Sequence, residues 1–483
     1  MYLGIDLGTS GVKAVLLDES GLLLSTHTVS LPVSRPQPLW SEQNPQDWWD
    51  STCEAITGLK QQQSLANVRA IGLTGQMHGA TFIDEFGEVL RPAILWNDGR
   101  SALECAELEE RVPTSRTITG NIMMPGFTAP KALWLKKHEP ETFAKVNKIL
   151  LPKDYLRFKL TSDFAADMSD AAGTLWLDVD KRDWNDSLLD ACGLSRDHMP
   201  QLFEGNQITG TLSSELAGQW GMSEVPVIAG GGDNAAGAVG VGIVKPGQAM
   251  LSLGTSGVYF AVSDGFLSNP ESAVHSFCHA LPNTWHMMSV VLSAASCLDW
   301  VAKLTGQESV PAMVKMVEEK ADRNSTVSFL PYLSGERTPH NDPTAKGVLF
   351  GMTHSTGPAE LALAVMEGVG FAFADGLDAL HSTSPVPEEI TLIGGGARSE
   401  YWRQMLSNIF GRKLVYRAGS DVGPALGAAR LANLAMNPEA DISDICPVPG
   451  LVQAHEPDMK EHARYEDKRG QFQQLYRDLK NSF

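Results

Sequence analysis

Short apolar runs separated by small polar turns open this chain, and this pattern predicts β-strands. Such strands are expected at residues 2–7, 12–18, 22–29 and 68–74. Between the third and fourth strands we expect a helix over 45–60, because Asn44 can cap its N-terminus and Pro45 suits its first position. The chain therefore begins with a three-stranded antiparallel meander, followed by a helix and a further strand.

The second half of the chain repeats this pattern. We expect strands at 249–253, 257–262, 274–280, 285–291 and 390–393, and helices near 293–305, 357–381, 399–410 and 423–435. Three linked strands, a helix and a strand form the element order of the ribonuclease-H-like fold. The sequence therefore predicts an α/β protein with two such domains and a cleft between them. Proline and glycine interrupt the apolar pattern at 244–247, which places the boundary between domains of residues 1–245 and 246–483.

One short sequence occurs in both halves. The residues Leu-Gly-Thr-Ser-Gly-Val stand at 7–12 and again at 253–258, each time after an apolar run. Glycines let backbone N–H groups converge on one point, and the hydroxyls of Thr and Ser add donors for phosphate oxygens. A plain hairpin is the alternative for one copy. The repetition favours two phosphate-binding turns, one on each wall of the cleft.

A third glycine cluster, Gly394–Gly396, follows a predicted strand and precedes a predicted helix. This order is typical of a backbone that approaches a nucleotide closely, with a helix N-terminus behind it. The spacing is not G-x-G-x-x-G, and no G-x-x-x-x-G-K-[ST] segment occurs. These two facts disfavour a dinucleotide-binding Rossmann site and a P-loop.

Two acidic residues and one polar trio accompany glycine-rich turns. Asp6 precedes the first repeated turn, where phosphates beside a carboxylate require a cation, and water-bridged Mg²⁺ suits this role. Asp233 stands in Gly-Gly-Gly-Asp-Asn, where partial desolvation suits a general base. The alternatives are a turn carboxylate for Asp6 and a helix N-cap for Asp233. The trio Gln76–His78 suits recognition of a hydroxyl group, and the alternative is a buried, satisfied histidine.

Composition limits the class of protein. The 483 residues carry a formal net charge of −19 at pH 7, which disfavours nucleic acids and anionic membrane surfaces as partners. The six cysteines lie far apart without a C-x-x-C pair, which disfavours a zinc site or a disulfide framework. No signal-peptide pattern and no apolar run of about 18 residues is found. We therefore expect a cytoplasmic protein with no membrane partner.

Taken together, Asp6, the two repeated turns, the segment around Asp233 and Gly394–Gly396 resemble the FGGY family of carbohydrate kinases. Further similar segments are 126–138, 331–343, 347–368 and 423–429. The first of these departs from the family pattern only at Ala132, where a larger apolar residue is usual. The resemblance covers essentially the whole chain. It implies the actin/sugar-kinase/chaperone ATPase fold and the use of ATP with Mg²⁺, and it favours a homodimer.

Within the family, segments 40–43, 75–79 and 94–100 resemble the xylulokinases, whereas glycerol kinases carry Arg-Glu in place of Met77-His78. The resemblance thus implies ATP-dependent phosphorylation of D-xylulose at its 5-hydroxyl. It implies that Asp233 is the general base, that Asp6 is the second catalytic residue and aligns the metal, and that Met77, His78, Asp233 and Asn234 lie at the sugar. The residues that it places at ATP are Thr9, Ser10, Lys13, Gly254, Thr255, Ser256, Gly394, Gly395 and Gly396.

Three other functions stay open. The nearest is an FGGY kinase for another sugar or polyol, such as gluconate, fuculose or erythritol. An actin- or chaperone-like ATPase shares the D-x-G-T turn, but it does not need Asp233 beside a hydroxyl-recognising segment. A sugar sensor without activity is disfavoured by the presence of both acids.

Overall fold

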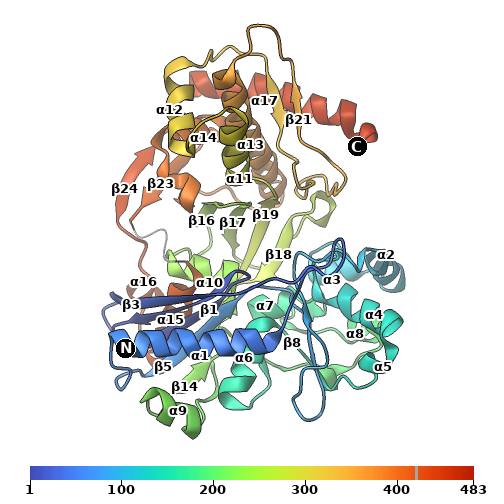
Figure 1. Ribbon diagram of the computed structural model, residues 1–483, viewed down its shortest axis with the longest axis vertical. Helices are drawn as coiled ribbons and strands as arrows, with labels where there is room; N and C mark the ends of the chain where they lie inside the picture. The colour runs from blue at the N-terminus through green and yellow to red at the C-terminus, as the bar shows by residue number, and fades with distance from the viewer. Residues whose placement is uncertain (419–422) are drawn as a thin grey trace.

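Two domains, each built on a seven-stranded sheet, make up the protein (Figure 1). The computed structural model describes residues 1–418 and 423–483. The first sheet contains β1 (Tyr2–Leu7), β2 (Gly11–Leu17), β3 (Leu23–Ser30), β5 (Ala70–Gly75), β13 (Ile208–Thr211), β14 (Pro226–Ile228) and β15 (Gly231–Gly232). The second contains β16 (Ala249–Leu253), β17 (Gly257–Ser263), β18 (His275–Cys278), β19 (Trp285–Val291), β22 (Glu389–Ile393), β23 (Lys413–Arg417) and β24 (Leu451–His455).

The two sheets share one strand order. It runs β3-β2-β1-β5-β14 in the first sheet and β19-β17-β16-β22-β23 in the second. In each sheet the first three of these strands are antiparallel neighbours, and the last three run parallel. This is the order of the ribonuclease-H-like fold, so the predicted duplication is confirmed.

All five predicted helices are present. α1 (Pro45–Gln62) begins as expected, because the side chain of Asn44 accepts a hydrogen bond from the N–H of Gln46 at 3.2 Å. The others are α11 (Ala295–Leu304), α13 (Pro358–His381), α14 (Glu400–Phe410) and α15 (Pro424–Met436). The apolar pattern does not predict α17 (Met459–Leu479), since its few buried positions include the charged residue Arg469.

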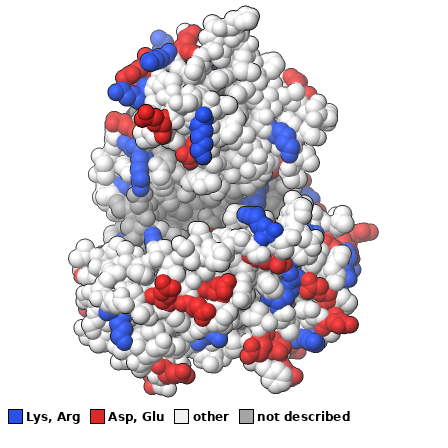
Figure 2. All heavy atoms as spheres, in the orientation of Figure 1, with Lys and Arg blue, Asp and Glu red and all other residues white. Residues whose placement is uncertain are grey.

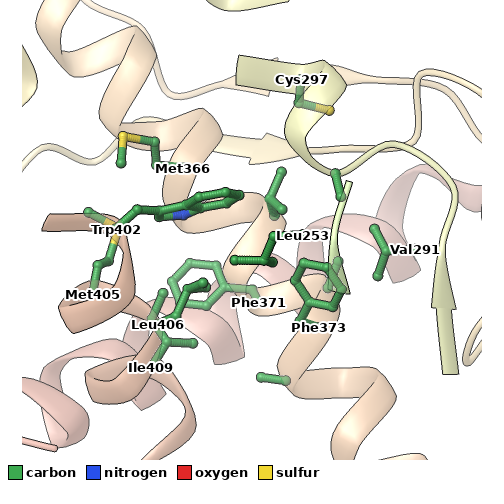
Figure 3. Close-up of a cluster of buried hydrophobic side chains, with 14 of the residues drawn as sticks. Leu253, Val291, Cys297, Met366, Phe371, Phe373, Trp402, Met405, Leu406 and Ile409 are labelled. Atoms are coloured by element: carbon green, nitrogen blue, oxygen red, sulfur yellow. The ribbon is translucent and has the colours of Figure 1, made fainter. Parts of the chain in front are cut away.

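The core of the second domain lies between its sheet and helices α13 and α14 (Figure 3). Phe371 and Phe373 of α13 and Trp402 of α14 are buried there, and Leu253 packs among them at the end of β16. Burial of each such side chain contributes roughly 1.5–3 kcal/mol to stability. Leu253 directly precedes the second repeated turn, so this core also holds that turn in place.

Helix α15, from the end of the second half, packs on the first sheet. A Cβ atom on Gly72 of β5 would lie 1.9 Å from the carbonyl oxygen of Ala428. Gly427 approaches α10 (Asp233–Gly240) as closely, because its Cβ would lie 1.7 Å from the carbonyl oxygen of Ala236. Glycine is required at these positions, since any side chain would overlap backbone atoms. Backbone contact therefore joins the two halves of the chain beside the predicted base.

Charged side chains are spread over both domains on the face seen in Figure 2, and the surface is hollowed where the domains meet. All six cysteines are free thiols, and five of them are buried. Within residues 1–418 and 423–483, no helix has both the length and the apolar character that a membrane span requires.

Candidate active site

Three parallel strands of the first sheet bring two carboxylates to one edge. In the register of the sheet, Asp6 of β1 lies beside Thr74 of β5, and Thr74 lies beside Gly231 of β15. Asp233 follows β15 directly as the first residue of α10, whose N-cap is Gly232. The N-cap alternative for Asp233 is therefore wrong. The carboxyl ends of parallel strands are the usual ligand-binding edge of an α/β sheet, and both acids lie there.

Both carboxyl groups favour their neutral form more than usual. Burial raises the pKa of Asp6 to about 7, and the negative charge of Asp233 adds to the shift while Lys13 opposes it. The Oδ1 atom of Asp6 is buried and has no hydrogen-bond partner in the described part of the chain. Burial raises the pKa of Asp233 to about 6, although the N–H and Nδ2 of Asn234 donate to its Oδ1 at 2.7 and 2.8 Å. Two interacting acids with an unsatisfied oxygen suit a cation.

A cavity of about 320 Å³ adjoins Asp233 and takes its walls from both halves of the chain. The first half supplies Met77, His78, Trp96, Met124, Gly126, Phe127, Asp233 and Asn234. The second supplies Ser252, Gly254, Thr255, Ser256, Val258, His275, Phe277, Met288, Val290 and Arg337. Polar groups from both domains thus converge on a volume suited to a small sugar.

His78 is held as a neutral hydrogen-bond acceptor beside this cavity. Its Nδ1 lies 2.7 Å from the carbonyl oxygen of Gly173, and a carbonyl oxygen only accepts, so Nδ1 carries the proton. Burial lowers the pKa of His78 to about 3, which leaves Nε2 free to accept from a hydroxyl group. The ring of Phe127 packs edge-on at a centroid distance of 4.5 Å. The buried amine of Lys131 donates to the carbonyl of His78 at 2.9 Å and fixes its left-handed backbone, with φ of 67°.

The first repeated turn exposes amide hydrogens and uses its other polar groups internally. The carbonyl oxygens of Thr9 and Ser10 both accept hydrogen bonds from neighbouring segments. The hydroxyl of Thr9 donates to Gln76 at 2.9 Å and accepts from Nε1 of Trp96 at 2.9 Å. In the described chain, the N–H groups of Thr9 and Ser10 have no acceptor. The backbone of this turn, with the hydroxyl of Ser10, is what remains for a phosphate.

The second repeated turn has the same arrangement. The carbonyl oxygens of Gly254 and Thr255 accept hydrogen bonds from the N–H groups of Ala295 and Ala294 at 2.9 and 3.0 Å, where α11 begins. Over the described residues, the N–H groups of Thr255 and Ser256 donate to nothing. Both copies therefore present amide hydrogens, which bind phosphate without a net positive charge.

The glycines at 394–396 lie next to the second turn. A Cβ atom on Gly394 would lie 2.9 Å from the carbonyl oxygen of Leu253, and its φ of +87° favours glycine. Gly395 and Gly396 line a larger cavity, of about 900 Å³, together with residues of α11, α12 (Val310–Lys320) and α14. A nucleotide base in that cavity would have its phosphates close to the Gly254–Ser256 turn.

Most of the predicted site residues line one of the two cavities, and the others line neither. Met77, His78, Asp233, Asn234, Gly254, Thr255 and Ser256 line the smaller cavity, and Gly395 and Gly396 line the larger one. Of the described site residues, Asp6, Thr9, Ser10, Lys13 and Gly394 line neither. Sequence reasoning does not find Trp96, Phe127, His275 or Arg337. Arg337 falls in the family-like segment 331–343, but an arginine in a loop carries no periodic signal.

A duplicated ribonuclease-H-like fold with an amide-lined turn in each half is the architecture of the actin and sugar-kinase class of ATPases. Residues 1–240 match the N-terminal domain, and residues 249–436 the C-terminal domain, of the FGGY family of carbohydrate kinases. The chain therefore belongs to the FGGY family of carbohydrate kinases.

Individual relatives are similar over the whole chain. The sequence is 64% identical over 479 residues to the xylulose kinase of Escherichia coli (strain K12), covering 99% of each chain. A solved structure described as a xyloylose kinase from Brucella ovis is 46% identical, with a TM-score of 0.95 over 100% of both chains. A gluconate kinase from Lactobacillus acidophilus is 26% identical, with a TM-score of 0.92 over 99% of this chain and 97% of that one. One fold thus serves proteins named for different sugars, so substrate choice must depend on the cavity.

Proposed function

We propose that this chain transfers the γ-phosphoryl group of ATP to the 5-hydroxyl of D-xylulose, giving ADP and D-xylulose 5-phosphate. The observation that carries this proposal is the cavity that Asp233 and His78 share with the turn Gly254–Ser256. It combines a carboxylate base, a hydroxyl acceptor and a phosphate-binding turn, which phosphoryl transfer to a sugar requires. The 64% identity with the Escherichia coli xylulose kinase supports D-xylulose as the sugar.

Asp233 acts as the general base. Its carboxylate accepts the proton of the 5-hydroxyl while the hydroxyl oxygen bonds to the γ-phosphorus and the bond from that phosphorus to ADP breaks. A pKa of about 6 leaves Asp233 ionised at neutral pH, and such a base typically contributes about 10²–10⁴ in rate. Met77, His78 and Asn234 hold the sugar chain beside it.

ATP binds across both domains. Its adenosine lies against Gly394–Gly396, and its phosphates accept hydrogen bonds from the turns that contain Thr9, Ser10 and Gly254–Ser256. Lys13 adds a positive charge on the side of Asp6. Because the second turn lines the smaller cavity and the first does not, closure of the domains is needed to bring both turns to the phosphates.

Mg²⁺ fits next to Asp6, whose buried Oδ1 lacks a partner among the described residues. In the same part of the chain, no group of three or more His, Cys, Asp or Glu side chains could hold a metal alone. This suits an ion that arrives with the nucleotide and keeps most of its water. When bound, it offsets negative charge on the phosphates.

A substrate panel with coupled detection of ADP tests the proposal. It compares D-xylulose, gluconate, fuculose, erythritol and a reaction without sugar, and D-xylulose is expected to give the highest kcat/KM. D233A should abolish transfer without changing the Kd for ATP, whereas D190A, at an exposed aspartate, should behave as wild type. Preference for another sugar would reject D-xylulose. Sugar-independent hydrolysis with filament formation would favour an ATPase, and transfer to no sugar would favour a sensor.

Three further features of the proposal concern the whole chain. We place the domain boundary at 245/246, between the segments that the two family models match. The use of ATP supports a cytoplasmic location. A homodimer stays a prediction, and light scattering of the purified protein tests it.

A further inference from the structure

Arg337 lines the smaller cavity from the second domain. The side chain is half-buried, and across the described residues its guanidinium has no hydrogen-bond acceptor and no carboxylate within ion-pair distance. Other buried guanidinium groups have partners within the protein: Arg100 pairs with Asp98 and Glu42, and Arg157 donates to two backbone carbonyls. Burying an unpaired cation lowers stability, so its presence in the cavity wall points to a ligand.

The neighbouring acid, Glu336, attracts the charge of Arg337, but its carboxylate does not pair with the guanidinium within the described residues. The carboxylate of Glu336 accepts a hydrogen bond from the N–H of His340 at 2.9 Å. The hydroxyl of Thr338 accepts a hydrogen bond from the N–H of Val290 at 3.2 Å. It donates one to the carbonyl oxygen of Ala273, just before β18, at 3.0 Å. Arg337 is thus held between two anchored residues. A guanidinium only donates hydrogen bonds, so the ligand must supply acceptor oxygens.

Arg337 lies on the same side of the cavity as two histidines. The ring of Phe127 stands between them, with centroid distances of 4.5 Å to His78 and 5.5 Å to His275. The positive charge of Arg337 adds to the effect of burial in lowering the pKa of each histidine. Arg337 is therefore close to His78, which is proposed to hold the sugar.

Arg337 is not among the charges that shift the pKa of the two carboxyl groups. The pKa of Asp233 is shifted by burial and by Asn234, and that of Asp6 by burial, by Asp233 and by Lys13. Lys13 is thus the cation next to Asp6, where the phosphates are proposed to bind. We therefore expect Arg337 to contact the part of the sugar that is remote from the 5-hydroxyl.

The open-chain ketose has one atom that suits this donor. When the 5-hydroxyl is free, D-xylulose cannot be a furanose, so its C2 carbonyl is exposed. A carbonyl oxygen only accepts hydrogen bonds, and neither Nε2 of His78 nor the carboxylate of Asp233 can donate to it. We propose that Arg337 donates hydrogen bonds to this carbonyl oxygen and thereby selects a ketose over the corresponding polyol. This inference rests on the proposed function.

Sugar binding by Arg337 variants tests the inference. Calorimetric titration measures the Kd of D-xylulose and of D-arabinitol, which carries a hydroxyl at C2, for wild type, R337M and R337K. The control is R323M, at an exposed arginine. We expect R337M to weaken D-xylulose binding about 10- to 100-fold, as for a lost charge-assisted hydrogen bond. D-arabinitol binding should change far less, the Kd for ATP should stay constant, and R337K should recover part of the loss.

The same variant gives a second readout. Because R337M removes an unpaired cation, it should raise the midpoint of thermal unfolding of the ligand-free protein; a lower midpoint would indicate a structural role and overturn the inference. Equal losses for both sugars would overturn the assignment to the carbonyl. If R337M lowers kcat without changing the affinity for the sugar, Arg337 acts on the phosphoryl group, and this result would also overturn the inference. If wild type does not phosphorylate D-xylulose at all, the proposed function fails instead, so the two failures are distinguishable.

Discussion

The hydroxyl of Ser169 accepts a hydrogen bond of 3.1 Å from the backbone N–H of Gly232, the residue before the proposed base. Ser169 lies in the short helix α7 (Met168–Ala172). The residue after that helix, Gly173, provides the carbonyl oxygen to which His78 donates. One turn of helix therefore positions both the base and the histidine proposed to bind the sugar.

A buried cluster of charges holds α7 in place. Oδ2 of Asp167 accepts hydrogen bonds from the N–H groups of Ser169 and Asp170 at 2.7 and 3.2 Å. The amine of Lys153 lies 2.8 Å from Oδ1 of Asp167 and 3.3 Å from Oδ2 of Asp170. Burial raises the pKa of Asp170 well above its usual range, which favours its neutral form beside the other acids. Networks of this kind are rigid when their members are paired.

We predict that S169A lowers kcat for sugar phosphorylation by roughly tenfold and stability by about 1–3 kcal/mol, because the N–H of Gly232 loses its acceptor. The Kd for ATP should not change, since the nucleotide contacts lie elsewhere. Steady-state kinetics and urea unfolding measure the two effects. S169T, which retains a hydroxyl, should recover activity, and S64A, at an exposed serine, is the control. A normal kcat in a destabilised S169A would show that the contact is only structural.

The rate should depend on pH through Asp233. Its pKa is raised to about 6, and only the ionised form accepts a proton. We therefore expect kcat/KM for D-xylulose to fall about tenfold per pH unit below about pH 6 and to level off above it. Initial rates across this range, with ATP and Mg²⁺ saturating, measure the profile. A midpoint near pH 4 would mean that the carboxylate is not desolvated.

Asp6 should make the ligand-free protein less stable as the pH rises. Its pKa increases from 3.8 in the unfolded chain to about 7 in the folded protein, so the folded state binds more protons between these values. Stability then falls with rising pH across that window. Accordingly, D6N should raise the midpoint of thermal unfolding at about pH 8 and have little effect near pH 4, without metal or nucleotide. A lower midpoint for D6N at about pH 8 would contradict the prediction.

The contact between α10 and α15 should not tolerate a side chain. G427A places a Cβ atom 1.7 Å from the carbonyl oxygen of Ala236, so we expect a loss of more than about 3 kcal/mol in the free energy of unfolding. Gly470 is the matched control, because its added Cβ would meet nothing within 4 Å in helix α17. G470A should therefore be neutral or gain up to about 1 kcal/mol. Similar unfolding curves for the two variants would refute the close approach.

Much of the fold could be predicted because its signals are local. The cap at Asn44, the alternating strands and the repeated turn all occupy neighbouring positions in the chain. Helix α17 could not be predicted in this way, since it buries Arg469 against carboxylates of α13 that are distant in sequence. The candidate site divides similarly. Glycine-rich turns indicate Asp6 and Asp233, whereas the roles inferred for Ser169 and Arg337 depend on neighbours that only folding supplies.

The amino-acid sequence alone determined the duplicated architecture and the chemistry of its turns, because strand pattern and glycine spacing act over a few residues. The tertiary structure decided which of these groups share a cavity and which are already satisfied. Strand register brings Asp6 and Asp233 to one edge of the sheet, internal hydrogen bonds occupy the hydroxyl of Thr9, and burial sets the protonation of His78. Such properties depend on desolvation and on contacts between distant segments, which the sequence pattern does not encode.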